Sequence, residues 1–93
     1  MNNRMYETLA KYMERYELIA TITAINITTQ IMNYRNKHKL TTIEFAKKFE
    51  LSKKQVKRWE SAKHDFTIRE ICFLFDRGII DKQVFTECSI GSI

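Results

Sequence analysis

Apolar residues recur at helical spacing from the start of the chain. Met5, Leu9, Tyr12 and Tyr16 follow one another at intervals of four, three and four residues, which predicts an amphipathic helix over residues 3–17. The chain has no proline and only two glycines. It therefore lacks the turn residues that punctuate an all-β protein, and we expect a mainly helical fold.

The next stretch, "LIATITAINIT", leaves two structures open. Ile19, Ile22, Ile25 and Ile27 are separated by small or hydroxyl residues. Spacings of three favour a helix, whereas the high content of β-branched residues favours a strand. The pattern does not choose between them.

Three later segments begin with the same sequence signature. A hydroxyl residue is followed three positions on by Glu or Gln, as in the capping box that satisfies the free N–H groups at a helix start. The pairs are Thr41 with Glu44, Ser52 with Gln55, and Thr67 with Glu70. They predict helices over about 42–49, 53–60 and 67–76.

Periodicity assigns an inward face to each helix. The residues expected in the core are Phe45, Ala46, Phe49, Val56, Trp59, Ile68, Ile71, Cys72 and Phe75. Gly78 is placed to end the third of these helices in the left-handed conformation, and Asp81 to cap a last short helix with Val84 and Phe85. With a further helix over about 28–38, the prediction is an all-α domain of five short helices.

The helix after Ser52 has two opposite faces. Lys53, Lys54, Lys57 and Arg58 lie on one side of a helical wheel, and Val56 and Trp59 lie on the other. Such a helix is docked by its apolar side and presents its cations outward. A solvated lysine-rich face and an anion-binding face both fit this pattern.

The charge of the chain is concentrated in one block. The net charge is +5, yet residues 35–63 hold ten Lys/Arg against three acids, while residues 1–34 balance to zero. A localised cationic surface indicates a polyanionic partner, either nucleic acid or an anionic membrane surface. No stretch approaches the roughly 20 apolar residues of a membrane span, and the charged start argues against a signal peptide. We expect a cytoplasmic protein.

Other chemistry is poorly represented. Cys72 and Cys88 form no CxxC motif, and both are expected to be reduced thiols. His38 and His64 have no partners at metal-ligand spacing, and no Ser/His/Asp set, carboxylate pair or glycine-rich phosphate loop is present. The sequence predicts neither a metal nor a cofactor, and no enzyme.

The segment "LTTIEFAKKFELSKKQVKRWESAK" (residues 40–63) resembles the lambda-repressor and Cro type of helix-turn-helix regulators, the xenobiotic-response-element family. The resemblance extends over about residues 28–85 and joins caps, turn length and apolar positions. It implies a five-helix DNA-binding domain over residues 28–93. Residues 1–27 would then form an N-terminal extension, a helix with a possible strand, that serves dimerisation or a partner.

The resemblance also implies roles for individual residues. The recognition helix would lie in the major groove, with base-reading residues Lys53, Lys54, Gln55, Lys57 and Arg58 and phosphate-binding residues Thr42, Ser61 and Lys63. Arg35 and Glu60 would form a structural ion pair. Two frequent glycines of the family are replaced here by Glu50 and Ala62, and "HDF" stands where a proline is usual.

Two classes of function follow. The first is a sequence-specific transcriptional regulator, a repressor more often than an activator, that binds a pseudo-palindromic operator in double-stranded DNA as a homodimer. The second is an antitoxin or phage-encoded inhibitor that binds a protein target through residues 1–27. A restriction–modification controller also fits the small size. For the dimer, three surfaces remain alternatives: the C-terminal helix with Val84, Phe85 and Ile79, paired strands, and the Tyr12 and Tyr16 face. Residues 1–27 could instead simply cover their own domain.

Overall fold

The computed structural model describes residues 3–85, and side chains from residue 14 onward. Every regular element in this range is helical. There are four α-helices and one short 3-10 helix: α1 (Asn3–Lys37), α2 (Thr42–Lys48), α3 (Lys53–Trp59), α4 (Ile68–Asp76) and η1 (Lys82–Phe85). The all-α prediction is therefore confirmed for the described residues, whereas the count of five short helices is wrong.

The first helix accounts for that error. α1 is a single helix of 35 residues, about 52 Å long at 1.5 Å per residue. It joins the segments expected over 3–17 and 28–38 through the isoleucine-rich run between them. The strand alternative for that run is wrong, and the boundary expected after residue 27 falls inside α1.

Packing explains why β-branched residues are helical here. Ile27 and Ile31, one turn apart on α1, are almost completely buried in the core. Helical spacing brings both to one face, and this burial outweighs the small intrinsic cost of isoleucine and threonine in a helix.

The helix caps follow the sequence signature closely. Thr41 and Thr67 form complete capping boxes with Glu44 and Glu70. Ser52 accepts a hydrogen bond from the Gln55 N–H at 3.0 Å, the first half of a box. These bonds fix where α2, α3 and α4 begin.

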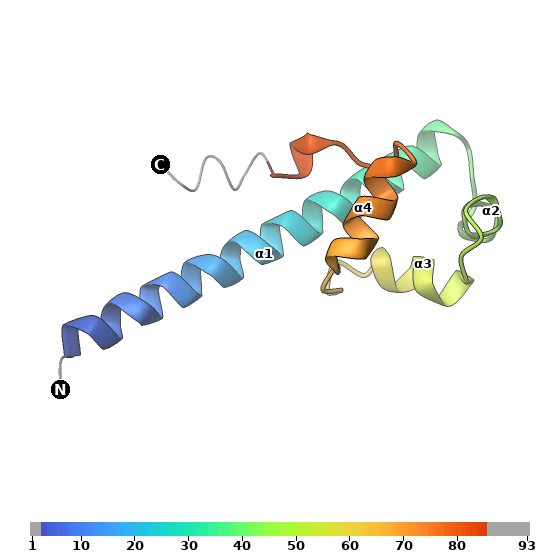
Figure 1. The fold of residues 1–93 in the computed structure, drawn as a ribbon. Helices are drawn as coiled ribbons and strands as arrows, with labels where there is room; N and C mark the ends of the chain where they lie inside the picture. Colours follow the sequence, from blue (N-terminus) through green and yellow to red (C-terminus); the bar gives the residue numbers. More distant parts are fainter. Residues whose placement is uncertain (1–2, 86–93) are drawn as a thin grey trace.

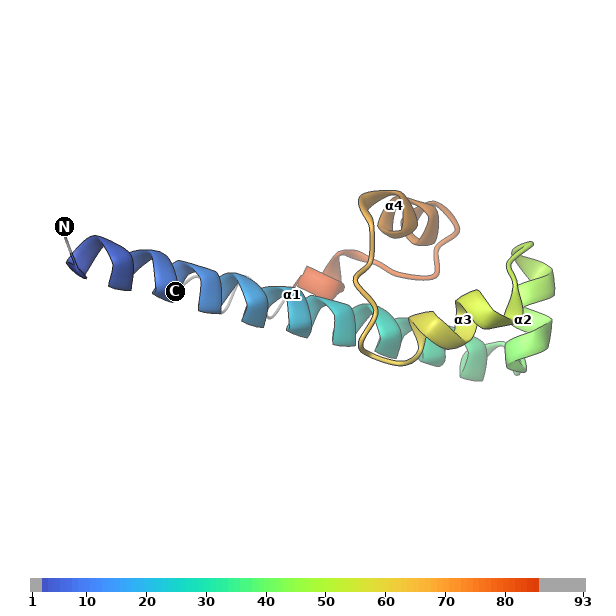
Figure 2. The same cartoon turned by 90° about the horizontal axis from the view of Figure 1, so that it is seen from below.

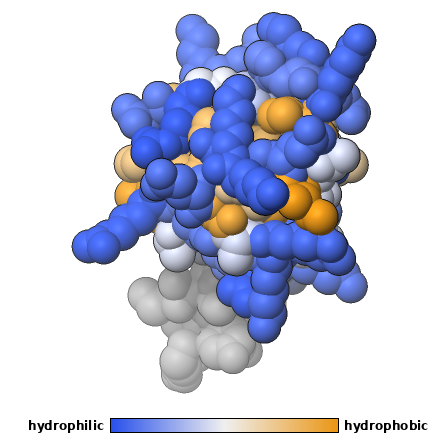
Figure 3. Space-filling view, turned by 90° about the vertical axis from the view of Figure 1, so that its right-hand side faces the viewer, coloured by the Kyte–Doolittle hydropathy of each residue, from blue (hydrophilic) through white to orange (hydrophobic). Residues whose placement is uncertain are grey.

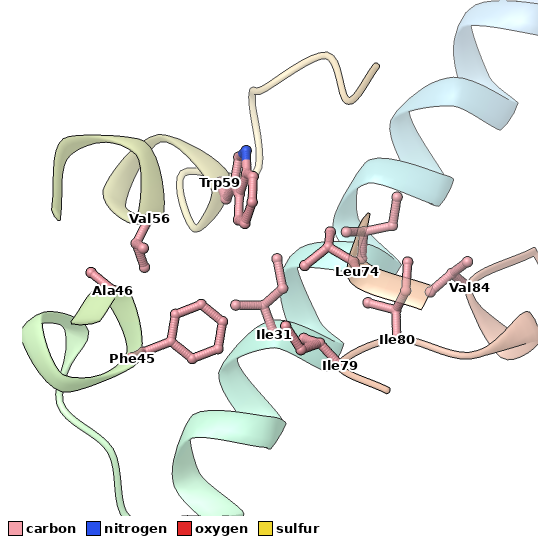
Figure 4. Packing of buried hydrophobic residues seen from close by; sticks show 10 residues of the cluster. Ile31, Phe45, Ala46, Val56, Trp59, Leu74, Ile79, Ile80 and Val84 are labelled. Atoms are coloured by element: carbon pink, nitrogen blue, oxygen red, sulfur yellow. The ribbon is translucent and has the colours of Figure 1, made fainter. Parts of the chain in front are cut away.

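The hydrophobic core lies between the second half of α1 and the other elements. Ile31 of α1 occupies its centre, with Phe45 of α2 on one side and Leu74 of α4 on the other (Figure 4). Val56 and Trp59 bring α3 into the same cluster, as predicted. The remaining buried members are Ile27, Ala46, Ile79, Ile80 and Val84, with Phe49 partly buried at the edge.

The rotation of α4 differs from the prediction. Leu74 is buried and Ile71 partly so, but Ile68 is 80% exposed, and Cys72 and Phe75 also face solvent. Residues 71–75 of α4 are apolar without interruption, so periodicity alone does not determine which side faces inward. Cys72 is consequently an exposed thiol rather than a core residue. Cys88 lies outside the described residues.

The last element returns to α1. Gly78 has a positive φ of 70°, as expected for the residue that ends α4, and the Asp81 side chain accepts the Gln83 N–H at 2.9 Å at the start of η1. Gln30 of α1 donates to Asp81 and accepts from its N–H. Asn26 donates to the Val84 carbonyl at 2.9 Å. η1 is thereby held against the second half of α1.

The arrangement is elongated. The described elements α2, α3 and α4 gather along the C-terminal half of α1, and none of them lies beside its blue N-terminal half (Figure 1). The perpendicular view agrees (Figure 2). The longest dimension, 56 Å, is close to the length of α1.

Candidate nucleic-acid interface

α3 is anchored by its apolar side. Val56 and Trp59 are buried to 0% and 1% exposure, whereas Lys53, Lys54, Lys57 and Arg58 are exposed and Gln55 is half-buried. The apolar and basic faces predicted from the sequence are therefore both present. Among the residues that the structure describes, none of the four α3 cations forms an ion pair, so their charges remain available to an external anion.

An ion pair ties α3 to α1. Arg35 Nε donates to Glu60 Oε2 at 2.6 Å, and its Nη2 donates to Glu60 Oε1 at 3.2 Å. Arg35 also donates to the Leu40 carbonyl at 3.2 Å. Both side chains are mostly buried. The two-bond geometry fixes direction as well as distance, so it orients the C-terminal end of α3 on α1.

A second link between these helices has no sequence signature. The Thr28 hydroxyl on α1 donates to the Trp59 carbonyl at 2.6 Å, and Thr28 is itself buried. This bond satisfies one of the free carbonyl groups at the end of α3. It also gives a buried threonine a partner, which a hydroxyl in a core requires. Sequence reasoning missed it, because Thr28 sits in a run of similar hydroxyl residues.

Glu70 connects the other side of α3 to α4. Its carboxylate accepts the Trp59 indole N–H at 2.7 Å and the Thr67 N–H at 2.8 Å, and it contacts His64 Nε2 at 3.0 Å. Burial of the carboxyl raises its pKa, but the bonds from Thr67, His64 and Trp59 outweigh burial and lower the pKa below its ordinary value. His64, in the loop between α3 and α4, thereby helps to hold α4 against Trp59.

The residues assigned to phosphate lie at the start of α2 and in the turn after α3. Thr42 is the first residue of α2 and is half-buried, and Lys63 is exposed in the turn after α3. The Ser61 hydroxyl donates to the Arg58 carbonyl at 2.7 Å and accepts the Lys63 N–H at 3.3 Å. Ser61 therefore shapes this turn, and its donated proton is engaged within the chain.

The two turns next to α3 are strained. Glu50, before α3, and Ala62, after it, have φ values of 56° and 63°, where a side chain is unfavourable and glycine is not. These are the positions where the resembling family often has glycine. Glu50 and Ala62 therefore hold a left-handed conformation that glycine would adopt at lower cost.

The three acids of the basic block are engaged to different degrees. Glu60 is paired with Arg35, Glu44 is engaged in the cap of α2, and Glu50 is exposed in the turn before α3. At the end of the molecule that carries α2, hydrophilic side chains cover most of the surface and apolar atoms show only in patches between them (Figure 3). The exposed cations of the basic block are Lys37, Lys39, Lys47, Lys48, Lys53, Lys54, Lys57, Arg58 and Lys63.

Other classes of site find little support in residues 3–85. The described residues contain no group of three His, Cys, Asp or Glu side chains able to hold a metal ion. Within the same range, no helix has the length and apolar character needed to cross a bilayer. Comparison with protein-family models, with curated proteins and with solved structures found no match to this chain.

Proposed function

We propose that this protein is a helix-turn-helix regulator that binds double-stranded DNA through α3. The observation that carries the proposal is the position of that helix. Its apolar side is buried, and its four cations face outward. Bonds to Arg35, Thr28 and Glu70 hold its C-terminal end, and the Ser52 cap fixes its start. A rigidly held cationic helix suits insertion into a major groove.

The contacts divide into two groups. Lys54 and Arg58 are assigned to base edges, since lysine and arginine pair well with the O6 and N7 acceptors of guanine, and the half-buried Gln55 to adenine. Lys53 and Lys57 read neighbouring bases or hold phosphates. Thr42, Ser61 and Lys63 are assigned to the sugar-phosphate backbone, where Ser61 acts through the turn that it stabilises. Base contacts specify sequence, and backbone contacts fix the register on the duplex.

One such module makes few base contacts, so we propose that two copies bind a pseudo-palindromic operator. Bound across a promoter, the dimer would block transcription. The Arg35–Glu60 pair is assigned no contact with DNA. It supports this function indirectly, because it orients α3 on α1.

The experiment that tests the proposal is selection of genomic DNA fragments by the purified protein at about 0.15 M salt, where non-specific binding is weak. We expect recovery of an inverted repeat with half-sites about 10–11 base pairs apart. The K54A/R58A double variant serves as the control and should lose the repeat while retaining weak general binding. Diffuse, salt-sensitive recovery by the wild-type protein would contradict sequence-specific binding.

A further inference from the structure

The isoleucine-rich part of α1 has a second apolar face that residues 3–85 leave largely exposed. Residues 18–34 contain no charged side chain. One side of this stretch enters the core through Ile27 and Ile31. On the opposite side, about 140–220° from Ile27 at 100° per residue, lie the residues we call the α1 seam: Leu18, Ile22, Ile25, Thr29 and Met32.

The seam has the spacing of a coiled coil. Its members follow at intervals of four, three, four and three residues, the repeat that keeps side chains in one line when two helices wind around each other. Leu18 is 59% exposed, Ile25 44% and Met32 41%. A helix that is apolar on both of its sides is normally covered on both. The part of the chain that the structure describes buries only the side with Ile27 and Ile31.

We propose that the α1 seam packs against the α1 seam of a second copy of this chain, in antiparallel orientation. A second copy fits because the residues beside the seam, at 19, 21, 26, 28 and 33, are Ile, Thr or Asn. None of them carries a charge, so nothing along two heptads repels an identical helix. The cationic block lies beyond this stretch, from residue 35 onward.

The charge distribution selects the antiparallel arrangement. In a parallel pair, the two cationic blocks would start side by side, at the interaxial distance of about 8–10 Å. In an antiparallel pair centred near Ile25, they lie at opposite ends. The helix dipoles also oppose each other favourably in that arrangement.

The same arrangement separates the two DNA-binding faces by a suitable distance. Arg35, which holds α3 through Glu60, lies ten residues beyond Ile25, or about 15 Å along the helix. Two copies related across Ile25 therefore place their Arg35 residues about 30 Å apart along the axis, close to the 34–36 Å between half-sites. The comparison with the half-site spacing rests on the proposed function, whereas the packing of the two seams does not.

The seam differs from the dimer surfaces considered from the sequence. The helical structure of α1 excludes the strand pairing. Of the C-terminal candidates, Ile79 and Val84 are buried in the core, whereas Phe85 is 40% exposed. Tyr16 is 75% exposed, lies on the same side of α1 as Ile27 and lines a groove of about 450 Å³ with Phe66. The side chain of Tyr12 lies outside what the structure describes.

The test is the oligomeric state of the full chain without DNA, measured by analytical ultracentrifugation at increasing concentration. We expect a dimer for the wild type and a dissociation constant raised at least about tenfold by Ile25→Glu, since each copy then buries a charge in the seam. Ile68→Glu is the matched control. It also replaces an exposed isoleucine, outside the seam, and should leave the dimer intact. Circular dichroism verifies that both variants are folded.

A crosslinking experiment tests the orientation. Leu18→Cys and Met32→Cys are placed in separate chains whose Cys72 and Cys88 are serine, and the two proteins are mixed and mildly oxidised. The antiparallel arrangement predicts a disulfide between the two different variants. Disulfides within each variant alone would overturn this orientation.

The outcomes separate this inference from the proposed function. A monomeric wild type, or a dimer lost through Ile68→Glu but not Ile25→Glu, overturns the seam whether or not DNA is bound. A monomer that still selects a DNA sequence would leave the proposed function standing. A seam-dependent dimer that selects no DNA sequence would support the seam and contradict the proposed function.

Discussion

Arg35 on α1 and Glu60 at the end of α3 are joined by two hydrogen bonds of 2.6 and 3.2 Å in a mostly buried setting. Neither residue belongs to the exposed cationic face of α3. Their bond nevertheless sets how α3 is oriented on the long helix, and so how that face is presented.

Breaking this pair should cost stability. Arg35→Ala leaves the Glu60 carboxylate buried without its partner, and we expect the free energy of unfolding to fall by about 2 kcal/mol. Urea denaturation followed by circular dichroism measures the change. Lys57→Ala, which removes an exposed and unpaired cation of α3, should change stability by less than about 0.5 kcal/mol. Equal effects of the two substitutions would show that the ion pair has no special structural role.

The strained turn before α3 offers a stabilising substitution. Glu50 has a left-handed backbone, so Glu50→Gly should raise the free energy of unfolding by about 0.5–1 kcal/mol, after allowance for the greater freedom of glycine in the unfolded chain. Glu50→Ala removes the charge but keeps the Cβ atom. It should give no such gain, and a similar increase from both variants would point to charge rather than backbone strain.

The Glu70 network predicts a pH dependence of stability. The folded protein lowers the pKa of Glu70 below its ordinary value of 4.5. Well above pH 4.5 the carboxylate is charged in both states, and its stabilising contribution is complete. As pH falls through 4.5 and then through the folded pKa, the unfolded chain takes up its proton first and the contribution is lost.

Glu70→Gln should therefore flatten the decrease in stability below pH 4.5, as measured by thermal unfolding between about pH 3 and 7. Some slope remains, because hydrogen bonds also lower the pKa values of Glu44, in the α2 cap, and of Asp81, bonded to Gln30. An unchanged slope in the variant would contradict the role assigned to the Trp59, Thr67 and His64 bonds.

DNA binding should separate the two groups of cations. Arg58→Ala is expected to reduce the preference for the selected operator over random DNA by about 1–3 kcal/mol. Lys63→Ala is expected to weaken binding to both DNAs and to reduce the slope of binding against salt by about one unit. Fluorescence anisotropy at several salt concentrations measures both effects. Identical effects of the two substitutions on cognate and random DNA would remove the assignment of Arg58 to base edges.

The sequence predicted the local features that depend on near neighbours. The three cap residues, the left-handed Gly78 and the opposite faces of α3 were all found where the pattern placed them. The caps depend on a side chain that reaches a backbone group a few residues away. The faces of α3 depend on a separation of apolar and polar residues that is clear enough to define one inward side. The Arg35–Glu60 pair came from the resemblance, and the structure contains it.

The tertiary structure decided those features for which the sequence pattern favoured no single outcome. The isoleucine-rich run is helical because a helix brings Ile27 and Ile31 to one face, and that face packs into the core. Leu74 rather than Ile68 faces inward on α4, since a helix apolar on most sides is oriented by its neighbours and connecting turns. The Thr28 hydroxyl donates a hydrogen bond to the Trp59 carbonyl, and no spacing in the sequence indicates this contact. Composition and periodicity describe each helix separately, whereas these outcomes depend on how the helices pack against one another.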